Sequence, residues 1–137
     1  MIYQLTENDY SKISKLGEEY DNHFSKKYIG NQSNIFAYEQ DGEILGFLIT
    51  EKTIDEVSII LIYVSQNYRH HGIGSTLIDY LIKNLKDCRR LLLEVSSKND
   101  IAISLYLKKG FMKISTRYNY YKDGSDAFVM EKRLDNE

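Results

Sequence analysis

The spacing of the apolar residues changes once along this chain, and that change constrains the fold more than any other feature. Between residues 35 and 64 the apolar residues form short runs rich in β-branched side chains and separated by turn residues, which is typical of strands. Asp41-Gly42 separates two of these runs and is a strong hairpin signal. From Ile73 to Leu85 the apolar residues instead recur at helical spacing. Antiparallel strands are therefore predicted to come first, followed by strands that alternate with helices.

The same patterns predict the remaining elements. We expect helices over residues 10–20, 73–85 and 99–109, with a weaker one over 22–28. We expect strands over residues 2–5, 35–40, 43–51, 56–64, 90–95, 111–121 and 127–133. This order predicts a mixed α/β fold. With 137 residues, the chain has the length of one domain, so residues 1–137 are predicted to form a single domain.

Composition excludes several classes of protein. Hydrophobic residues make up 42% and charged residues 28%, which is the balance of a globular protein. No apolar run is long enough to span a bilayer, and no basic run is dense enough to indicate nucleic acid, so neither partner is expected. The single cysteine, Cys88, and the lack of a secretory segment favour a cytoplasmic location.

Charge is distributed unevenly along the chain. Residues 1–64 carry 5 Lys and Arg against 11 Asp and Glu, whereas residues 65–137 carry 13 against 9. A basic half suits a ligand that bears phosphate, and an acidic half suits a cationic acceptor. Solvated surface charge would give the same asymmetry, so both interpretations stay open.

The stretch from Tyr68 to Ser75 is predicted to bind a phosphate. It leads from a strand into the amphipathic helix, and Gly72 and Gly74 would let the backbone approach a ligand closely. Free N–H groups at the start of the helix and the positive end of its dipole favour an anion. Arg69, with His70 or His71, would add positive charge.

Other glycine-rich sites fit this stretch poorly. A dinucleotide-binding loop needs a glycine where Leu77 stands, and a P-loop needs a Gly-Lys pair that is absent. Adjacent His70 and His71 make a poor metal pair, so no metal is expected. A helix start that binds nothing remains the alternative.

A second group of residues follows the strand at 90–95. Glu94 lies near the end of an apolar strand, where a carboxylate is expected to be partly desolvated and to serve as a base. Asn99 and Tyr106 are seven residues apart on a short helix and so share a face, from which a phenol could give its proton to a leaving group. The structural alternatives are a solvated charge, a helix cap and a core aromatic.

Taken together, the motifs resemble those of the GNAT acetyltransferases. Arg69-x-x-Gly72-x-Gly74 after a long strand is similar to the pyrophosphate-binding signature of that superfamily. The resemblance implies a mostly antiparallel, twisted sheet of six or seven strands with about four helices, splayed between its two central parallel strands. It also implies acetyl-CoA as co-substrate, held by the backbone of one strand end and by the loop after it: Ile62, Tyr63, Val64, Arg69, His70, His71, Gly72, Ile73, Gly74 and Ser75.

Within that superfamily, residues 57–134 look like the ribosomal-protein-alanine N-acetyltransferases. The resemblance rests on four elements: Leu93-Glu94-Val95-x-x-x-Asn99, Ala102-x-x-Leu105-Tyr106-x-x-x-Gly110-Phe111, Arg117-x-Asn119-Tyr120-Tyr121 and Asp126-Ala127-x-Val129-Met130. It implies direct transfer of acetyl to a primary amine in a ternary complex, with the N-terminal α-amine of a protein as acceptor. Carried over, Glu94 would be the general base, Tyr106 the general acid and Asn99 a contact of the co-substrate.

The first half of the chain departs from that family. An aromatic-Pro-Trp segment usually follows the first helix, and this chain has no Pro and no Trp. The acceptor therefore stays open between a protein N-terminus and a small amine such as a polyamine, an aminoglycoside or an amino acid. A non-catalytic domain that binds acetyl-CoA is a further alternative, and either a monomer or a homodimer is compatible with the sequence.

Overall fold

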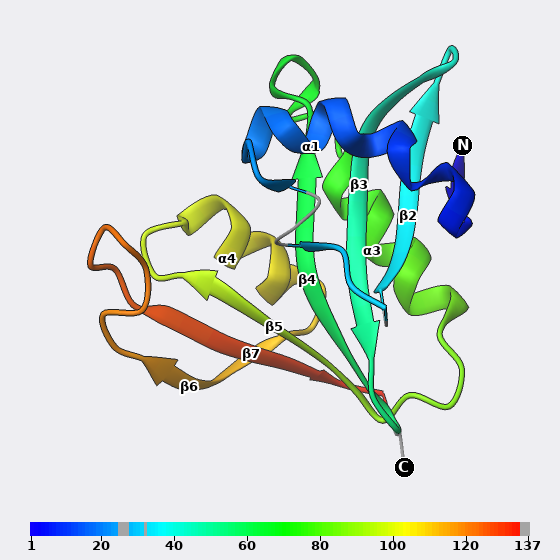
Figure 1. Cartoon of the computed structure of the whole chain (residues 1–137). Helices are drawn as coiled ribbons and strands as arrows, with labels where there is room; N and C mark the ends of the chain where they lie inside the picture. Colours follow the sequence, from blue (N-terminus) through cyan, green and yellow to red (C-terminus); the bar gives the residue numbers. More distant parts are fainter. Residues whose placement is uncertain (25–27, 32, 135–137) are drawn as a thin grey trace. The chain divides into compact units, whose positions relative to one another are not determined.

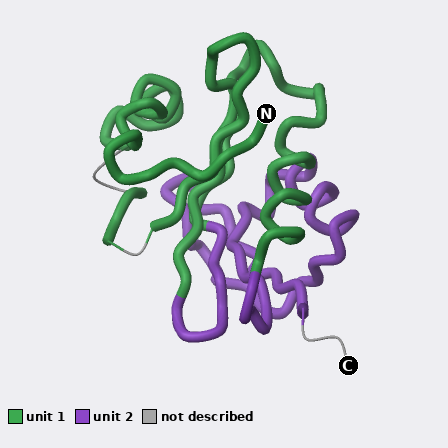
Figure 2. The backbone as a smooth tube through the Cα atoms, turned by 90° about the vertical axis from the view of Figure 1, so that its right-hand side faces the viewer, with its two compact units in different colours: residues 1–52, 60–85 green, residues 53–59, 86–137 purple. Residues whose placement is uncertain are grey.

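The computed structural model describes residues 1–24, 28–31 and 33–134. Backbone contacts divide the chain into two compact units, which Figure 2 distinguishes by colour. Unit 1 comprises residues 1–52 and 60–85, and unit 2 comprises residues 53–59 and the chain from residue 86 onward. Strand β4 (Glu56–Val64) contributes its first part to unit 2 and its last part to unit 1.

Unit 1 consists of an antiparallel sheet with helices on both faces. In chain order its elements are β1 (Ile2–Gln4), the 3₁₀ helix η1 (Glu7–Ile13), α1 (Ser14–Tyr20), β2 (Ser33–Gln40), β3 (Glu43–Lys52), the end of β4, η2 (Gln66–Tyr68) and α3 (Ile73–Asn84). Helix α1 lies against one face of the sheet and α3 against the other (Figure 1).

Alternation along β2 and β3 produces these two faces. Ile35 pairs with Ile49 and Ala37 with Phe47, and all four side chains belong to the core cluster that includes Ile13 of η1. The residues between them point to the opposite face, because successive side chains of a strand alternate. The hairpin turn is the predicted one: Asp41 and Gly42 have φ angles of 54° and 79°, as a two-residue type I′ turn requires.

Unit 2 is built around the strand that carries Glu94. Its elements are the start of β4, β5 (Arg90–Ser96), α4 (Asp100–Lys108), β6 (Met112–Arg117) and β7 (Ala127–Arg133). Strand β7 pairs antiparallel with β5 on one side and with β6 on the other. Strand β5 pairs in parallel with β4 from Arg90–Glu56 to Leu93–Ile59.

The seven strands follow the order β1-β2-β3-β4-β5-β7-β6, which confirms the predicted mixed α/β fold. The parallel pairing runs to Ile59 and Leu93, whereas β4 itself ends at Val64 and β5 at Ser96. Among the described residues there are three α-helices (α1, α3 and α4). None of these three is long and apolar enough to cross a membrane. The weak helix predicted over 22–28 lies partly outside the described residues.

Two predicted boundaries are wrong. The first helix is expected over residues 10–20, but its first half is the 3₁₀ helix η1 and the α-helical part begins only at Ser14. The strand expected over residues 111–121 ends at Arg117. It ends there because Asn119 has a φ of 52°, and the backbone N–H groups of Tyr120 and Tyr121 both donate to the carbonyl of Ser125.

Candidate functional site

In unit 1 the glycine-rich loop has the geometry that anion binding requires. Gly72 is the N-cap of α3, with a φ of 80°, and a Cβ placed there would meet no atom within 4 Å. The first helical N–H groups, those of Ile73, Gly74 and Ser75, have no helical carbonyl to bond to, because α3 starts at Ile73. The loop therefore presents several free donors beside an open surface, which suits a phosphate.

The start of α3 is fixed by close packing on β3. Ile73 is 4% exposed, and a Cβ on Gly46 would lie 3.0 Å from its Cγ2 atom and 3.2 Å from the carbonyl oxygen of Tyr63. Glycine at position 46 therefore lets α3 and the end of β4 approach β3 closely. It also follows that Ile73 can offer a ligand only its backbone, since its side chain belongs to the core.

The charged side chains of the loop are exposed. Arg69, His70 and His71 all face solvent, and His70 adopts a φ of 68°, which is uncommon for a residue other than glycine. The Nε atom of Arg69 donates to the carbonyl of Val64 at 3.1 Å, and its guanidinium lies 5.3 Å from the ring centre of Tyr63. Arg69 thus packs on the end of β4.

Tyr63 connects the same strand end to helix α1. Its hydroxyl donates to Glu19 at 2.9 Å, and the backbone N–H of Gln66 donates to the same carboxylate oxygen at 3.3 Å. Burial, and then the hydrogen bond to Glu19, raise the pKa of Tyr63 above its ordinary value. Ile62, Tyr63 and Val64 are the residues predicted to contact the co-substrate through their backbone. Of these, Tyr63 has a side chain that binds Glu19 on one side and contacts Arg69 on the other.

In unit 2, Glu94 is paired with an arginine. Leu93 and Val95 are buried, and Glu94 points to the opposite face of β5, where its side chain is 31% exposed. Its Oε2 atom accepts a hydrogen bond of 2.5 Å from the Nε atom of Arg117. The alternation of β5 turns this side chain away from its buried neighbours, toward solvent and toward Arg117.

Tyr120 completes this carboxylate cluster. Hydrogen bonding to Glu94 is the main cause that raises the pKa of Tyr120 above its ordinary value. The guanidinium of Arg117 lies 5.9 Å from the centre of the Tyr120 ring. Glu94 therefore has Arg117 and Tyr120 as its neighbours, and Arg117 donates a hydrogen bond to the carboxylate.

Tyr106 has a different environment from the exposed tyrosines. It is only 6% exposed, and its ring lies 5.8 Å from that of Phe111. Burial, with a smaller contribution from Tyr121, raises the pKa of Tyr106 to about 12. Tyr121 in turn makes an edge contact with Tyr120, with the ring centres 5.1 Å apart, so Tyr106 and the carboxylate cluster are linked within unit 2.

Asn99 caps helix α4. Its Oδ1 atom accepts a hydrogen bond of 3.1 Å from the backbone N–H of Ala102. The structural alternative recognised in the sequence, a helix cap, is thus present. A contact of Asn99 with a co-substrate would have to use the Nδ2 donor group, because the oxygen already satisfies the helix start.

The loop between β6 and β7 presents two tyrosines to solvent. Tyr118 is 77% exposed, and Tyr120 is exposed as well. The loop is held from within, because the backbone N–H of Asn119 donates to Asp126 and the hydroxyl of buried Ser125 lies 3.1 Å from that of Ser96. The Asp126-Ala127 element therefore orders the segment that carries Tyr120.

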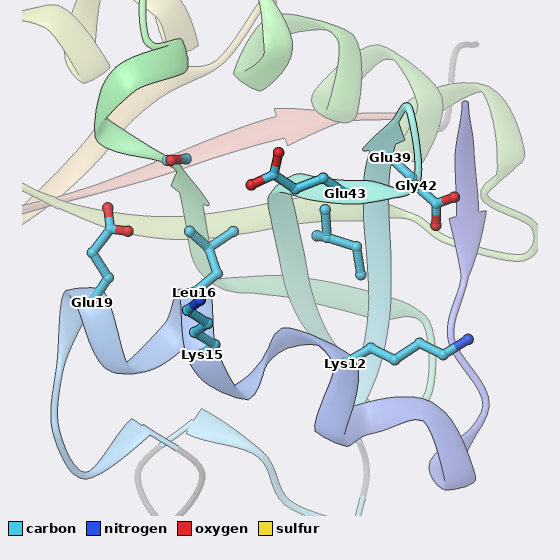
Figure 3. Close-up of a pocket in the computed structure, with 9 residues that line it drawn as sticks. Lys12, Lys15, Leu16, Glu19, Glu39, Gly42 and Glu43 are labelled. Carbon is cyan, nitrogen blue, oxygen red and sulfur yellow. The ribbon is translucent and has the colours of Figure 1, made fainter.

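A pocket of about 520 Å³ lies elsewhere on unit 1, beside η1 and α1 and the turn between β2 and β3 (Figure 3). Three glutamates and two lysines line it: Glu19, Glu39, Glu43, Lys12 and Lys15. Glu19 already binds Tyr63, and Glu39 accepts a hydrogen bond from Tyr3. The two lysines offset part of the negative charge of the three glutamates, so the pocket carries little net charge.

The predicted residues therefore fall into two groups. The loop residues from Arg69 to Ser75 and the strand end from Ile62 to Val64 belong to unit 1, and Glu94, Asn99 and Tyr106 belong to unit 2. Sequence reasoning missed the contacts of Arg117 and Tyr120 with Glu94. The Arg-x-Asn-Tyr-Tyr motif contains both residues, but the motif alone does not reveal which carboxylate they bind.

Comparison with known families gives a match over most of the chain. The family model described as the acetyltransferase (GNAT) family matches residues 1–111. The [ribosomal protein bS18]-alanine N-acetyltransferase of Escherichia coli (strain K12) is 37% identical over 100 residues, which cover 69% of this chain and 68% of that protein. An N-alpha-acetyltransferase of Sulfurisphaera tokodaii is 29% identical over 141 residues, which cover 90% of this chain and 84% of that protein.

A solved structure of an acetyltransferase is also similar to this chain. The crystal structure of the ribosomal-protein-S18-alanine N-acetyltransferase from Escherichia coli matches with a TM-score of 0.88 at 28% identity. The match covers 100% of this chain and 95% of that one.

Proposed function

The chain belongs to the GNAT family of acetyltransferases and is an N-acetyltransferase, and on this premise we propose that it moves acetyl from acetyl-CoA to the N-terminal α-amine of a protein. The observation that carries the proposal is the cluster of Glu94, Arg117 and Tyr120 in a chain that also has the phosphate-binding geometry at Gly72. A carboxylate base and a diphosphate site are what this reaction needs.

Unit 1 would hold the donor. The free N–H groups at the start of α3 would bind the diphosphate of coenzyme A, and Arg69 would add a charged contact. Edge groups of Ile62, Tyr63 and Val64 would pair with the amides of the pantetheine arm. The open space around the missing Cβ of Gly72 supports this proposal, because any side chain there would narrow the approach. Acetyl-CoA supplies the thioester on which the reaction depends.

Glu94 would remove the proton from the acceptor amine, directly or through one water. The nitrogen lone pair then attacks the thioester carbonyl carbon, and the carbon–sulfur bond breaks. The nitrogen loses its second proton as the amide forms, and the departing thiolate takes up a proton and leaves as the thiol of coenzyme A. The exposure of the Glu94 side chain supports this role, since an acceptor can reach the carboxylate from solvent. Acid–base steps of this kind contribute about 10²–10⁴-fold to a rate.

Tyr106 would donate a hydrogen bond to the departing thiolate. Its pKa of about 12 keeps the phenol protonated at every pH at which the enzyme is assayed. Complete transfer of the proton to a thiolate with a pKa of about 8.5 would be uphill, so the donation is a hydrogen bond made as the carbon–sulfur bond breaks. Asn99 would contact the co-substrate through its side-chain N–H groups.

The exposed loop between β6 and β7 supports a peptide as the acceptor. Tyr120 lies beside Glu94, and the neighbouring Tyr118 is almost fully exposed. Tyrosine hydroxyls beside the base can bind the backbone of an extended chain whose first amine reaches Glu94. The relatives named as N-terminal acetyltransferases agree with this acceptor.

A panel of amines tests the acceptor. The purified protein and acetyl-CoA are incubated with a short peptide that begins with alanine and has an internal lysine, with the same peptide blocked at its N-terminus, and with a polyamine or an aminoglycoside. Release of coenzyme A measures the rate, and fragment mass spectrometry locates the acetyl group. We expect acetylation of the α-amine of the unblocked peptide alone.

Two other outcomes would overturn parts of the proposal. Rapid acetylation of the polyamine or aminoglycoside with slow reaction of the peptide would assign a small-molecule acceptor. Binding of acetyl-CoA without transfer to any amine would assign a non-catalytic domain. Glu94→Gln serves as the matched control in each arm, because it preserves the shape of the side chain and removes the base.

A further inference from the structure

We propose that Arg117 is the positioning residue of Glu94: it reaches across β7 to hold the carboxylate in the one orientation from which it takes the acceptor's proton. This inference rests on the proposed acetyl transfer and goes beyond it by naming a residue to which neither base nor donor chemistry is assigned. The contact that motivates it is the hydrogen bond of 2.5 Å from Nε of Arg117 to Oε2 of Glu94.

The register of the sheet explains why an arginine is needed. Glu94 on β5 is opposite Val129 of β7, and Arg117 on β6 is opposite Ala127 of the same strand. The two residues are therefore two strands apart and offset by two residues along β7, which separates their backbones by about 12 Å. Only long side chains that extend toward each other can span β7, and a glutamine at position 117 is too short to do so.

The arginine also has a geometry that a lysine lacks. Its guanidinium presents several N–H donors in a rigid plane, so one hydrogen bond fixes the direction of the next. Here Nε binds Glu94 while the same guanidinium lies over the ring of Tyr120, whose pKa is raised mainly by the same carboxylate. The carboxylate is thus flanked by two groups that lie beside each other.

Stability does not account for this arrangement. The Arg117 side chain is 56% exposed, and an ion pair with that much exposure contributes little to folding. Ordering two long side chains also costs conformational entropy. An exposed but ordered pair around a proposed base is better explained by the reaction, which is sensitive to a displacement of the base by about 1 Å.

A second consequence concerns the charge of the acceptor. With the guanidinium beside it, Glu94 offers a protonated amine less net attraction, because the positive charge of Arg117 offsets that of the carboxylate. Arg117 would raise the turnover number rather than the affinity for the acceptor.

A double-mutant cycle tests the inference. Arg117→Gln, Glu94→Gln and the double variant are compared with the wild-type protein, using acetyl-CoA and the acceptor that gives the fastest transfer. Lys113→Gln is the matched control, because it removes a positive charge from the same strand, where Lys113 lies over the ring of Phe128. Calorimetry with acetyl-CoA and thermal unfolding are measured for every variant.

We expect Arg117→Gln to lower kcat by about tenfold or more, with the affinity for acetyl-CoA and the unfolding temperature close to those of the wild type. In the Glu94→Gln background the same change should lower kcat less than twofold, because there is no carboxylate left to position. Arg117→Lys, or guanidinium added to Arg117→Gln, should restore part of kcat. Lys113→Gln should keep the wild-type rate.

The results that would overturn the role of Arg117 differ from the result that would overturn the proposed acetyl transfer. If the wild type transfers acetyl and Glu94→Gln is slow, but Arg117→Gln matches Lys113→Gln, Arg117 does not position the base. Equal effects of Arg117→Gln in both backgrounds would likewise overturn the inference, and a faster Arg117→Gln variant would show that the arginine inhibits. A wild type that transfers acetyl to no amine would instead remove the proposed function.

Discussion

The buried phenol of Tyr106 gives the sharpest quantitative prediction. Burial raises its pKa to about 12, whereas an unfolded chain leaves a tyrosine at about 10. The stability that this neutral phenol contributes is fully present below pH 10 and is lost as the pH rises toward 12, because the unfolded chain ionises first. Two pKa units correspond to about 2.7 kcal/mol in total, of which about half, roughly 1.4 kcal/mol, is lost at pH 11.

Urea unfolding of the wild type and of Tyr106→Phe at pH 8 and pH 11 measures this loss. The free energy of unfolding of the wild type should fall by about 1.4 kcal/mol more than that of the variant between the two pH values. Tyr3, whose pKa is also raised to about 12, is present in both proteins and cancels in the comparison. Equal falls would refute the reasoning, since they would mean that the Tyr106 hydroxyl is hydrated in the folded protein.

Three further predictions concern the glycines and the pH dependence. Gly72→Ala should lower the free energy of unfolding by about 1–2 kcal/mol, because a residue with a Cβ is strained at a φ of 80°. Gly72→Asn should lower it by less, and equal urea midpoints for both variants and the wild type would contradict this. Gly17→Ala should be destabilising by about 1–3 kcal/mol, because its Cβ would overlap the ring of Phe24. Adding Phe24→Leu should recover part of this loss, whereas strictly additive effects in urea unfolding would show that residues 17 and 24 do not touch. The kcat/KM for a peptide acceptor should rise with pH through the pKa of its α-amine, about 8, and stay level to pH 10, since Tyr106 keeps its proton. A fall in kcat/KM between pH 8 and pH 10 would count against Tyr106 as the donor.

Elements with a strong local pattern were predictable from the sequence. The predicted and observed bounds agree for β4 and β7, and α3 ends one residue earlier than expected. The turn at Asp41-Gly42 has the two positive φ angles that its residue types favour. Each of these features depends on neighbours in sequence: alternation, helical spacing or the conformational freedom of glycine.

Features that depend on distant residues were not predictable. Strand β6 ends at Arg117 because Asp126 and Ser125, several residues later, bind the backbone of the next segment. The pairing of Glu94 with Arg117 requires the order β5-β7-β6, in which the last strand in sequence lies between the other two. No spacing along the chain reveals this contact, so the apolar neighbours of Glu94 in β5 could not predict its ion pair with Arg117.

Binding of acetyl-CoA to the purified, folded protein tests the central claim most directly. Calorimetric titration should give one molecule bound per chain, and Arg69→Gln should weaken the affinity roughly tenfold, because a charge-assisted contact with the diphosphate is lost. A titration of the wild type that produces no binding heat at any temperature, with the chain shown to be folded, would contradict the account.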